Sequence, residues 1–485
     1  MEPMYRLRRK AGTSLPVFSF ACSLLLALAA GCVTPPEAPP APAPVPPPIE
    51  EPVVIPEPDP TRLALTRIVG LLEQGDYAGA LAEFDGIPEE DAGSPEIRLL
   101  RASVLISAGR VREARALVQE LLVPEPDNPE LLFALASIES AEGRNREYRA
   151  LLDRIVRAHP DHADALLALG NLQLANRSWR NAAAWFDRVL TLDAANGEAL
   201  LGRAKAYRGA RAPEQAEELL GRAIELYPGW AAPYSERAQL YRYYGDYPAA
   251  LADLSRAREL APGDYWIACD LGSVLLSLNR KDEALAEYSR AAQIAPGNFL
   301  AYVYLAGLKD DLGDYSGAEQ DYITLARLNP DYYFAFEGIG LHKMKNQQWA
   351  EARDAFREAW NRAQDQWAYA LLTAACWMRA ERLQAPRQFL EGALRRFTRE
   401  SLEWYMLRLY YDLSGDTDVA SRVDRERNPV TKARMAFYLA QYYDIRGSRT
   451  LADRYFLLVK QLDQKAIPEW RINEWIVAER GLTPE

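Results

Sequence analysis

The same sequence pattern returns every 34 residues along most of this chain. Its clearest copy is Gly245-Asp-Tyr247, followed by Ala250 and Leu254. Counting by 34 in both directions from Ala250, nine of eleven phased positions are alanine, and the residue four places later is apolar in every copy except the one ending at Asp424. No single helix or strand has this period. The 485 residues are therefore expected to build one long solenoid rather than several globular domains.

Each repeat is predicted to hold two helices joined by a tight turn. The eighth position of the first helix is small in most copies, which lets the paired backbones approach closely: Ala102, Ala136, Gly170, Ala204, Ala238, Gly272, Ala306, Gly340 and Ala374. Glycine recurs where that helix ends and a left-handed conformation is needed: Gly75, Gly109, Gly143, Gly245, Gly313 and Gly415. Proline recurs after the second helix and stops it: Pro126, Pro160, Pro228, Pro262, Pro296 and Pro330.

Together these features resemble the tetratricopeptide repeat (TPR), and Gly313-Asp-Tyr315, Ala318, Tyr322 and Pro330 form one of the best copies. The resemblance covers residues 61–459. It implies an all-α fold, a right-handed superhelix of about 11–12 helical hairpins whose first helices line a concave surface. The pattern fades after Ser401 and slips by two at Ala452.

The C-terminal end is predicted to hold an imperfect last repeat and one more helix. Residues Lys432–Val459 form the last repeat. In 460–485, an amphipathic helix over Ile467–Val477 is expected to cover the final hairpin. Trp470 and Trp475 in this helix suggest a partner site as the alternative.

The N-terminus has the pattern of an export signal. Basic residues at Arg6–Lys10 precede an apolar stretch, Leu15–Ala30, that is short for a membrane-spanning helix. The end of this stretch, Leu28-Ala-Ala-Gly-Cys32, resembles the lipobox of bacterial lipoproteins. That resemblance implies a signal peptide over residues 1–31 and lipidation of Cys32, with Val33 directing the protein to the outer membrane. Ordinary signal cleavage and an uncleaved anchor helix remain the alternatives.

Residues 32–60 are predicted to be a tether behind the anchor cysteine. Nearly half of residues 33–60 are proline, which favours polyproline II over helix or sheet, and the stretch would span roughly 85 Å when extended. Such segments also bind aromatic grooves, but a spacer is the preferred interpretation here.

The rest of the sequence argues against catalysis and against nucleic acid. The net charge is −11, and it becomes −14 without residues 1–31, which contain four basic residues and one acidic residue. An acidic body is not drawn to nucleic acid or anionic lipid. No phosphate loop, nucleophile elbow or zinc motif is present, so no cofactor, metal or small-molecule substrate is expected. His159 and His162 are predicted to lie in a solvated turn, and His342 to be packed or at a groove edge.

Two further pairs of residues have no predicted chemical role. Acidic pairs such as Asp310-Asp311 are interpreted as solvated surface. Cys269 and Cys376 are about three repeats apart, too far for a disulfide, and are expected to be free thiols.

The predicted binding site is the concave face between residues 231 and 413. The positions that the TPR family turns toward this face are unusually apolar and aromatic here, which is typical of binding surfaces. Burial of the same residues by a tight superhelix or by the C-terminal helix is the alternative. The predicted contact residues are Arg242, Tyr243, Trp266, Leu300, Val303, Phe334, Glu337, Leu341, Met344, Lys345, Leu371, Met378 and Tyr405.

These features predict a non-catalytic, lipid-anchored interaction scaffold in the bacterial cell envelope, with a protein or extended peptide as partner. Lipoproteins that resemble it serve in outer-membrane protein assembly, pilus biogenesis and polysaccharide export. A surface-exposed adhesin or host-contact lipoprotein is the alternative.

Overall fold

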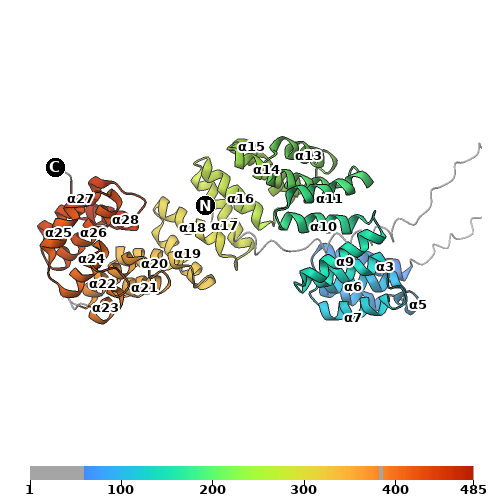
Figure 1. The fold of residues 1–485 in the computed structure, drawn as a ribbon, viewed down its shortest axis with the longest axis horizontal. Coiled ribbons are helices and arrows are strands. Elements are labelled where there is room, and N and C mark those ends of the chain that lie inside the picture. Colours follow the sequence, from blue (N-terminus) through green and yellow to red (C-terminus); the bar gives the residue numbers. More distant parts are fainter. Residues whose placement is uncertain (1–58, 382–385, 484–485) are drawn as a thin grey trace, which may run out of the picture. The chain divides into compact units, whose positions relative to one another are not determined.

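The computed structural model describes residues 59–381 and 386–483, and every regular element in these ranges is helical (Figure 1). The chain divides into two compact units, one up to Leu240 and the other from Tyr241 onward. The first unit contains α3 (Pro60–Glu73), α4 (Tyr77–Glu83), the short 3₁₀ helix η1 (Phe84–Gly86), α5 (Glu89–Ala92), α6 (Pro95–Ser107), α7 (Val111–Leu122), α8 (Pro129–Ala141), α9 (Asn145–Ala158), α10 (Ala163–Ala175), α11 (Trp179–Leu192), α12 (Gly197–Gly209) and α13 (Pro213–Leu226).

Helix α14 (Ala231–Tyr244) spans the boundary between the units. The second unit continues with α15 (Tyr247–Leu260), α16 (Tyr265–Ser277), α17 (Lys281–Ile294), α18 (Phe299–Leu312), α19 (Tyr315–Leu328), α20 (Tyr333–Lys345), α21 (Trp349–Arg362), α22 (Trp367–Ala380), α23 (Arg387–Leu394), α24 (Leu402–Asp412), α25 (Asp416–Arg425), α26 (Pro429–Ile445), α27 (Arg449–Leu462) and α28 (Pro468–Arg480). Within each unit the helices pair as hairpins that stack in chain order, as the sequence period predicts.

Small residues hold each hairpin together, as predicted. The phased alanines Ala114, Ala182 and Ala284 are completely buried. Where the eighth position is glycine, an aromatic ring of the second helix lies directly over it. A Cβ atom on Gly340 would lie 2.6 Å from the Phe356 ring, closer than atoms can approach without displacement. The spacing of small and aromatic residues therefore sets the distance between the two helices.

The turn inside each hairpin requires a left-handed residue. All six glycines predicted there have positive φ, for example 83° at Gly313. Four repeats reach the same conformation without glycine: Arg177, Arg211, Asn279 and Gln347 have φ between 56° and 62°. The geometry of the repeat thus imposes the left-handed turn even where the side chain opposes it.

Replacing Arg211 with glycine is expected to stabilise the first unit by about 0.5–1 kcal/mol. A left-handed L-residue costs roughly 1–2 kcal/mol, and the greater chain entropy of glycine cancels only about 0.5–1 kcal/mol of that gain. Chemical denaturation would measure the difference. As a control, Lys205→Gly places the same residue inside α12 and should lose about 1 kcal/mol. Equal effects of the two substitutions would show that the turn is not strained.

Successive repeats are joined by an arginine that the sequence pattern did not reveal. Arg154, Arg188 and Arg290 stand on second helices, and each guanidinium donates to the carbonyl oxygen of the proline that ends the preceding repeat. The distances are 3.1 Å to Pro126, 2.9 Å to Pro160 and 2.8 Å to Pro262. Each bond supplies a donor to a turn carbonyl that the helix itself leaves without a partner.

The repeat pattern changes in the last hairpins. In α25 the buried side chains are Val419 and Val423, while Asp424 is exposed and Ala420 is only half-buried. The helix is therefore rotated by one position, which explains the break in the sequence phase. The predicted final hairpin is present as α26 and α27, with Ala452 and Phe456 completely buried.

Helix α28 follows this hairpin and is held by buried polar contacts as well as apolar packing. The Tyr438 hydroxyl donates to the fully buried Glu469 at 2.8 Å, and the Asn473 amide donates to the Phe456 carbonyl at 3.1 Å. Arg480 also forms ion pairs with Asp444 and Asp453, at 2.5 and 2.8 Å. These contacts make α28 a fixed part of the second unit.

Several sequence predictions lie outside the described residues. They are the signal peptide over residues 1–31, lipidation at Cys32 and the tether up to residue 58. The described chain opens at Asp59, whose carboxylate accepts a hydrogen bond from the Thr61 amide and caps α3. In the ranges that the structure describes, no helix is long and apolar enough to cross a membrane.

Candidate peptide-binding pocket

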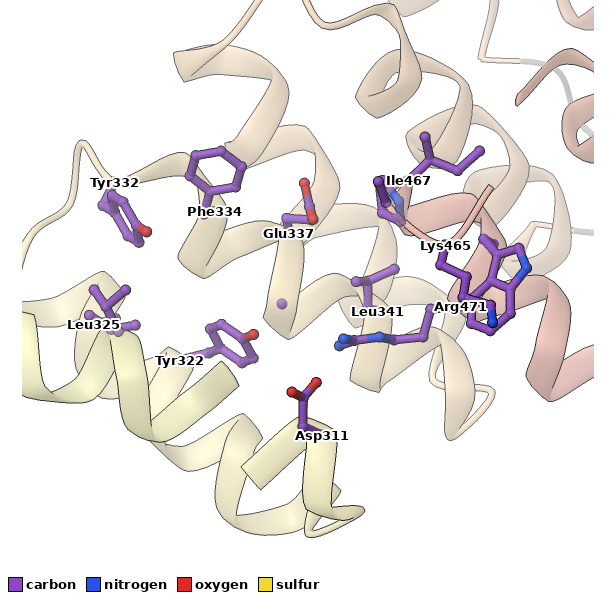
Figure 2. A pocket seen from close by; sticks show the side chains of 15 residues that line it. Asp311, Tyr322, Leu325, Tyr332, Phe334, Glu337, Leu341, Lys465, Ile467 and Arg471 are labelled. Atoms are coloured by element: carbon purple, nitrogen blue, oxygen red, sulfur yellow. The ribbon is translucent and has the colours of Figure 1, made fainter. Parts of the chain in front are cut away.

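A pocket of about 520 Å³ opens in the second unit, within the size range of protein ligand sites. Figure 2 shows Tyr322, Tyr332 and Phe334 on one side of the cavity and Lys465, Ile467 and Arg471 on the other. The remaining lining residues complete an apolar floor and a charged rim: Val303, Asp311, Leu325, Glu337, Gly338, Leu341, Ala466, Pro468 and Trp470.

One wall of the pocket consists of residues that the repeat register predicted for the concave face. Val303 lies on α18, whereas Phe334, Glu337 and Leu341 lie on α20. Phe334 is 46% exposed, although its ring packs against Tyr332 and Tyr333 with centroids 5.6 and 4.2 Å away. A large exposed aromatic side chain in a concave pocket is a typical binding anchor.

The opposite wall was not predicted, because it comes from the far end of the chain. Residues 465–471 form the turn before α28 and its first turn. For this helix the sequence indicated two alternatives, a partner site at Trp470 and Trp475 or burial of the concave-face residues by the helix itself. The structure shows that the C-terminal helix both covers α27 and returns to the concave side of α20.

A buried polar cluster joins α28 to the repeats beside the pocket. The two carboxylate oxygens of Asp310 lie 2.8 Å from Nε2 of His342 and 2.7 Å from Nη1 of Arg471. The Tyr322 hydroxyl donates to the same carboxylate at 2.9 Å. The interpretation of Asp310 as solvated surface was wrong, because its side chain is 1% exposed. His342 is packed, as predicted.

The partners of Asp310 determine its ionisation. Burial alone would raise the pKa of this carboxyl group, but hydrogen bonding to His342, the charge of Arg471 and the Tyr322 hydroxyl outweigh burial and lower its pKa. The carboxylate is thus kept charged, and it anchors Arg471 at the edge of the pocket.

The pKa of Glu337 is shifted in the opposite direction to that of Asp310. Burial raises the pKa of Glu337, although the Tyr369 hydroxyl donates a hydrogen bond to its carboxylate. The pocket therefore contains one acid whose charge is disfavoured and another, Asp311, that pairs with Lys281 at 3.1 Å.

An aromatic and cationic stack extends the contact between α28 and the repeats. The rings of Trp475 and Tyr315 meet edge to face at 5.7 Å. The predicted contact residue Lys345 lies over both, with its amine 3.0 Å from the centre of the Tyr315 ring and 5.2 Å from that of Trp475. Lys345 is therefore engaged within the chain.

Four predicted contact residues are buried. Leu341, Met344, Leu371 and Met378 are 5%, 4%, 0% and 1% exposed, and of these only Leu341 lines the pocket. Helix α26 packs directly against α22, with the Tyr438 hydroxyl donating to the Ala368 carbonyl at 3.2 Å, and α28 packs on α20. The alternative that the chain itself covers this stretch is correct here.

The remaining predicted residues lie outside the pocket. Arg242 reaches Asp270 of the next repeat at 3.3 Å, and Tyr243 is 66% exposed. Trp266 and Leu300 are partly buried against a core of α16 and α17. Tyr405 lies under the guanidinium of Arg422, 3.7 Å from the ring centre.

Residues considered for other chemistry have structural roles. The prediction of a solvated turn is wrong for His162, whose Nδ1 accepts from the Ala165 amide at 3.2 Å and whose ring packs near Phe133. Cys269 and Cys376 are buried free thiols, and burial raises the pKa of Cys376 to about 12. In the described part of the chain, no cluster of side chains is suited to hold a metal ion.

The stacked hairpins and the concave pocket define a helical-repeat protein. Models of the tetratricopeptide repeat match residues 71–138, 133–199, 198–229, 235–299 and 305–359, together more than half of the sequence. The chain therefore belongs to the tetratricopeptide repeat family.

Solved TPR structures are similar to parts of the chain. A tetratricopeptide repeat protein from Parabacteroides merdae is 18% identical, with 50% of this chain and 97% of that chain covered and a TM-score of 0.39. The Cut9–Hcn1 hetero-tetramer of APC/C is 19% identical, with 64% of this chain and 62% of that chain covered and a TM-score of 0.41. Pseudomonas aeruginosa PilF is 18% identical, with 42% of this chain and 92% of that chain covered and a TM-score of 0.38. Among curated proteins, none matches the sequence.

Proposed function

We propose that this protein is a non-catalytic, lipid-anchored scaffold of the bacterial cell envelope that binds a protein or an extended peptide in the pocket beside Phe334. The observation that carries the proposal is the pocket itself. It combines an exposed aromatic anchor, an apolar floor formed by Val303 and Leu341, and a wall that α28 fixes in place.

A preformed pocket of this kind favours binding over catalysis. Its walls are held by the buried Asp310 cluster and by the attachment of α28, so little ordering is required when a ligand enters. The titratable groups at its edge are engaged in structural pairs, namely Asp310 with Arg471 and Asp311 with Lys281.

The anchor part of the proposal rests on the sequence. The basic n-region, the apolar stretch and the residues before Cys32 together fit an exported lipoprotein, and the proline-rich residues behind Cys32 would hold the repeats away from the membrane.

In-cell crosslinking tests the proposal. A photoreactive amino acid replaces Phe334 in the native host, and the matched control places it at Ile323, an exposed residue on the second helix of its hairpin. We expect one envelope protein to be crosslinked from position 334 and not from position 323. In the same cells, Cys32→Ser should move the scaffold from the membrane fraction to the soluble fraction.

Each arm has a result that contradicts it. Equal crosslinking from both positions would remove the pocket from the proposal, and unchanged membrane association of Cys32→Ser would remove the lipid anchor. Absence of crosslinks, together with degradation by protease on intact cells, would favour the surface adhesin instead.

A further inference from the structure

One carboxylate in the pocket has no cation beside it. Glu337 lies one helical turn after Phe334, so both side chains leave the same face of α20 (Figure 2). The Tyr369 hydroxyl donates to one oxygen of this carboxylate. Within the described ranges no basic side chain forms an ion pair with it, and Arg434 and Arg471 act on it only through longer-range attraction. The chain itself thus leaves the charge of Glu337 uncompensated.

The cations around this carboxylate already have acidic partners of their own. They form three pairs: Arg471 with Asp310 at 2.7 Å, Arg434 with Glu469 at 3.1 Å and Lys465 with Asp463 at 3.6 Å. The other acid of the lining, Asp311, is paired with Lys281. Because these pairs are balanced, Glu337 is the group that remains without a counter-charge. A cationic side chain of a ligand would complement it, and an anionic side chain would not.

The ionisation of Glu337 supports this reading of the charges. Burial raises the pKa of Glu337 by more than the Tyr369 hydroxyl and the distant arginines lower it. A carboxyl group that is taken out of water without a cation beside it resists ionisation. A cation bound against Glu337 would favour the carboxylate again, so the ligand would remove a cost that burial imposes on the empty pocket.

The aromatic side of the pocket suits the same kind of ligand. Phe334 is 46% exposed, and Tyr332 lines the cavity beside it. Aromatic faces attract cations, and a planar guanidinium stacks on them in a way that an ammonium group does not. This protein makes such a contact elsewhere, where the guanidinium of Arg422 lies 3.7 Å from the centre of the Tyr405 ring. The N–H donors at the edge of a guanidinium let it stack on a ring and bind a carboxylate at the same time.

We propose that the pocket beside Phe334 binds an arginine side chain of the partner peptide. The guanidinium donates to Glu337 and stacks on Phe334, while the aliphatic stem of the arginine packs on the floor formed by Val303 and Leu341. The net charge of −11 also favours the approach of a basic segment. The inference rests on the proposed function, because it names the chemistry that the same pocket recognises.

Binding of short peptides to the purified full-length protein tests the inference. The probe is the acetylated and amidated peptide Ala-Ala-Arg-Ala-Ala. In one control peptide citrulline, which has nearly the shape of arginine but no charge, takes the central position, and in another lysine does. Saturation-transfer NMR measures such weak binding. We expect the arginine peptide to bind about tenfold or more tightly than the citrulline peptide, and more tightly than the lysine peptide.

Variants of the protein locate the site. Glu337→Gln keeps an acceptor for the Tyr369 hydroxyl and should weaken binding of the arginine peptide by about tenfold or more. The matched control is Asp311→Asn, which removes the charge of an exposed, paired acid in the same lining and should change affinity by less than about threefold. Phe334→Ala should weaken binding by about fivefold, whereas Ile323→Ala should leave it unchanged. Circular dichroism checks that each variant keeps its helices.

Three results would overturn the inference: no binding of the arginine peptide, equally tight binding of the citrulline or lysine peptide, or binding that is indifferent to Glu337→Gln. The two proposals fail separately. If position 334 crosslinks an envelope protein in cells but the arginine peptide is not preferred, the scaffold stands and the arginine assignment is wrong. If the arginine peptide is preferred but no envelope protein is crosslinked, the chemistry of the pocket stands and the cellular partner is wrong.

Discussion

Replacing Asp310 with alanine is expected to destabilise the second unit by about 3–5 kcal/mol. Asp310 is the common acceptor for His342, Tyr322 and Arg471, and removing one partner of a buried ionic cluster leaves the others without compensation. The loss should be visible in chemical denaturation as a lower midpoint of the transition that reports on this unit. Because Arg471 ties α28 to α18, the substitution should also expose the α28 region to hydrogen exchange.

The neighbouring residue supplies the control. Asp311→Ala removes the same charge one position along the helix, but Asp311 is exposed and its pair with Lys281 is solvated, so the effect should lie between 0 and about 1 kcal/mol. Equal losses from the two substitutions would show that the buried cluster does not carry the stability.

The pH dependence follows from the lowered pKa of Asp310. A carboxyl group whose folded-state pKa lies below its unfolded value contributes stability above the unfolded pKa and loses it as the pH falls through the folded pKa. The difference in unfolding free energy between wild type and Asp310→Asn should therefore have its largest value near pH 7. It should decrease once the pH falls below 3.8, the ordinary pKa of aspartate.

A valine in place of Gly340 should cost about 1–3 kcal/mol. Its Cβ would lie 2.6 Å from the Phe356 ring, which is itself fully buried, so the two helices of this hairpin must separate or the ring must leave its preferred rotamer. Valine is a better helix former than glycine by a few tenths of a kcal/mol, so the net loss measures the steric conflict. Denaturant unfolding followed by circular dichroism is the measurement.

Gly307→Ala is the matched comparison. Gly307 lies inside α18, and a Cβ there would meet nothing within 4 Å. Alanine should stabilise that helix by about 0.5–1 kcal/mol. If Gly340→Val were as stable as the wild type, the contact between Gly340 and Phe356 would not set the spacing of the hairpin.

Most of the fold could be predicted from the sequence because it depends on local contacts that repeat. Gly340 and Phe356 are sixteen residues apart, and Gly313 closes a turn between two adjacent helices. Such contacts recur every 34 residues, so each copy confirms the others. The shifted register of α25 is also a local feature, because Asp424 breaks the 34-residue pattern at the point where this helix is rotated by one position.

Part of the candidate site was also predicted, and for the same reason. The repeat register placed Val303, Phe334, Glu337 and Leu341 on one concave face, and the structure brings them together around the pocket. The repeat register also placed Met344, Leu371 and Met378 on this face, but the structure shows that they are buried. Register determines which way a side chain points from its helix, but not what lies opposite.

What lies opposite is decided by tertiary structure alone. The ion pair between Asp310 and Arg471 joins residues separated by 161 positions. Its formation depends on small rotations accumulated over the intervening hairpins, and no 34-residue pattern encodes their sum. By itself the sequence determined the repeat, its turns and the direction of each side chain. Only the folded chain decided that α26 and α28 cover one stretch of the concave face and leave the pocket beside Phe334 open, because that outcome depends on contacts between distant helices.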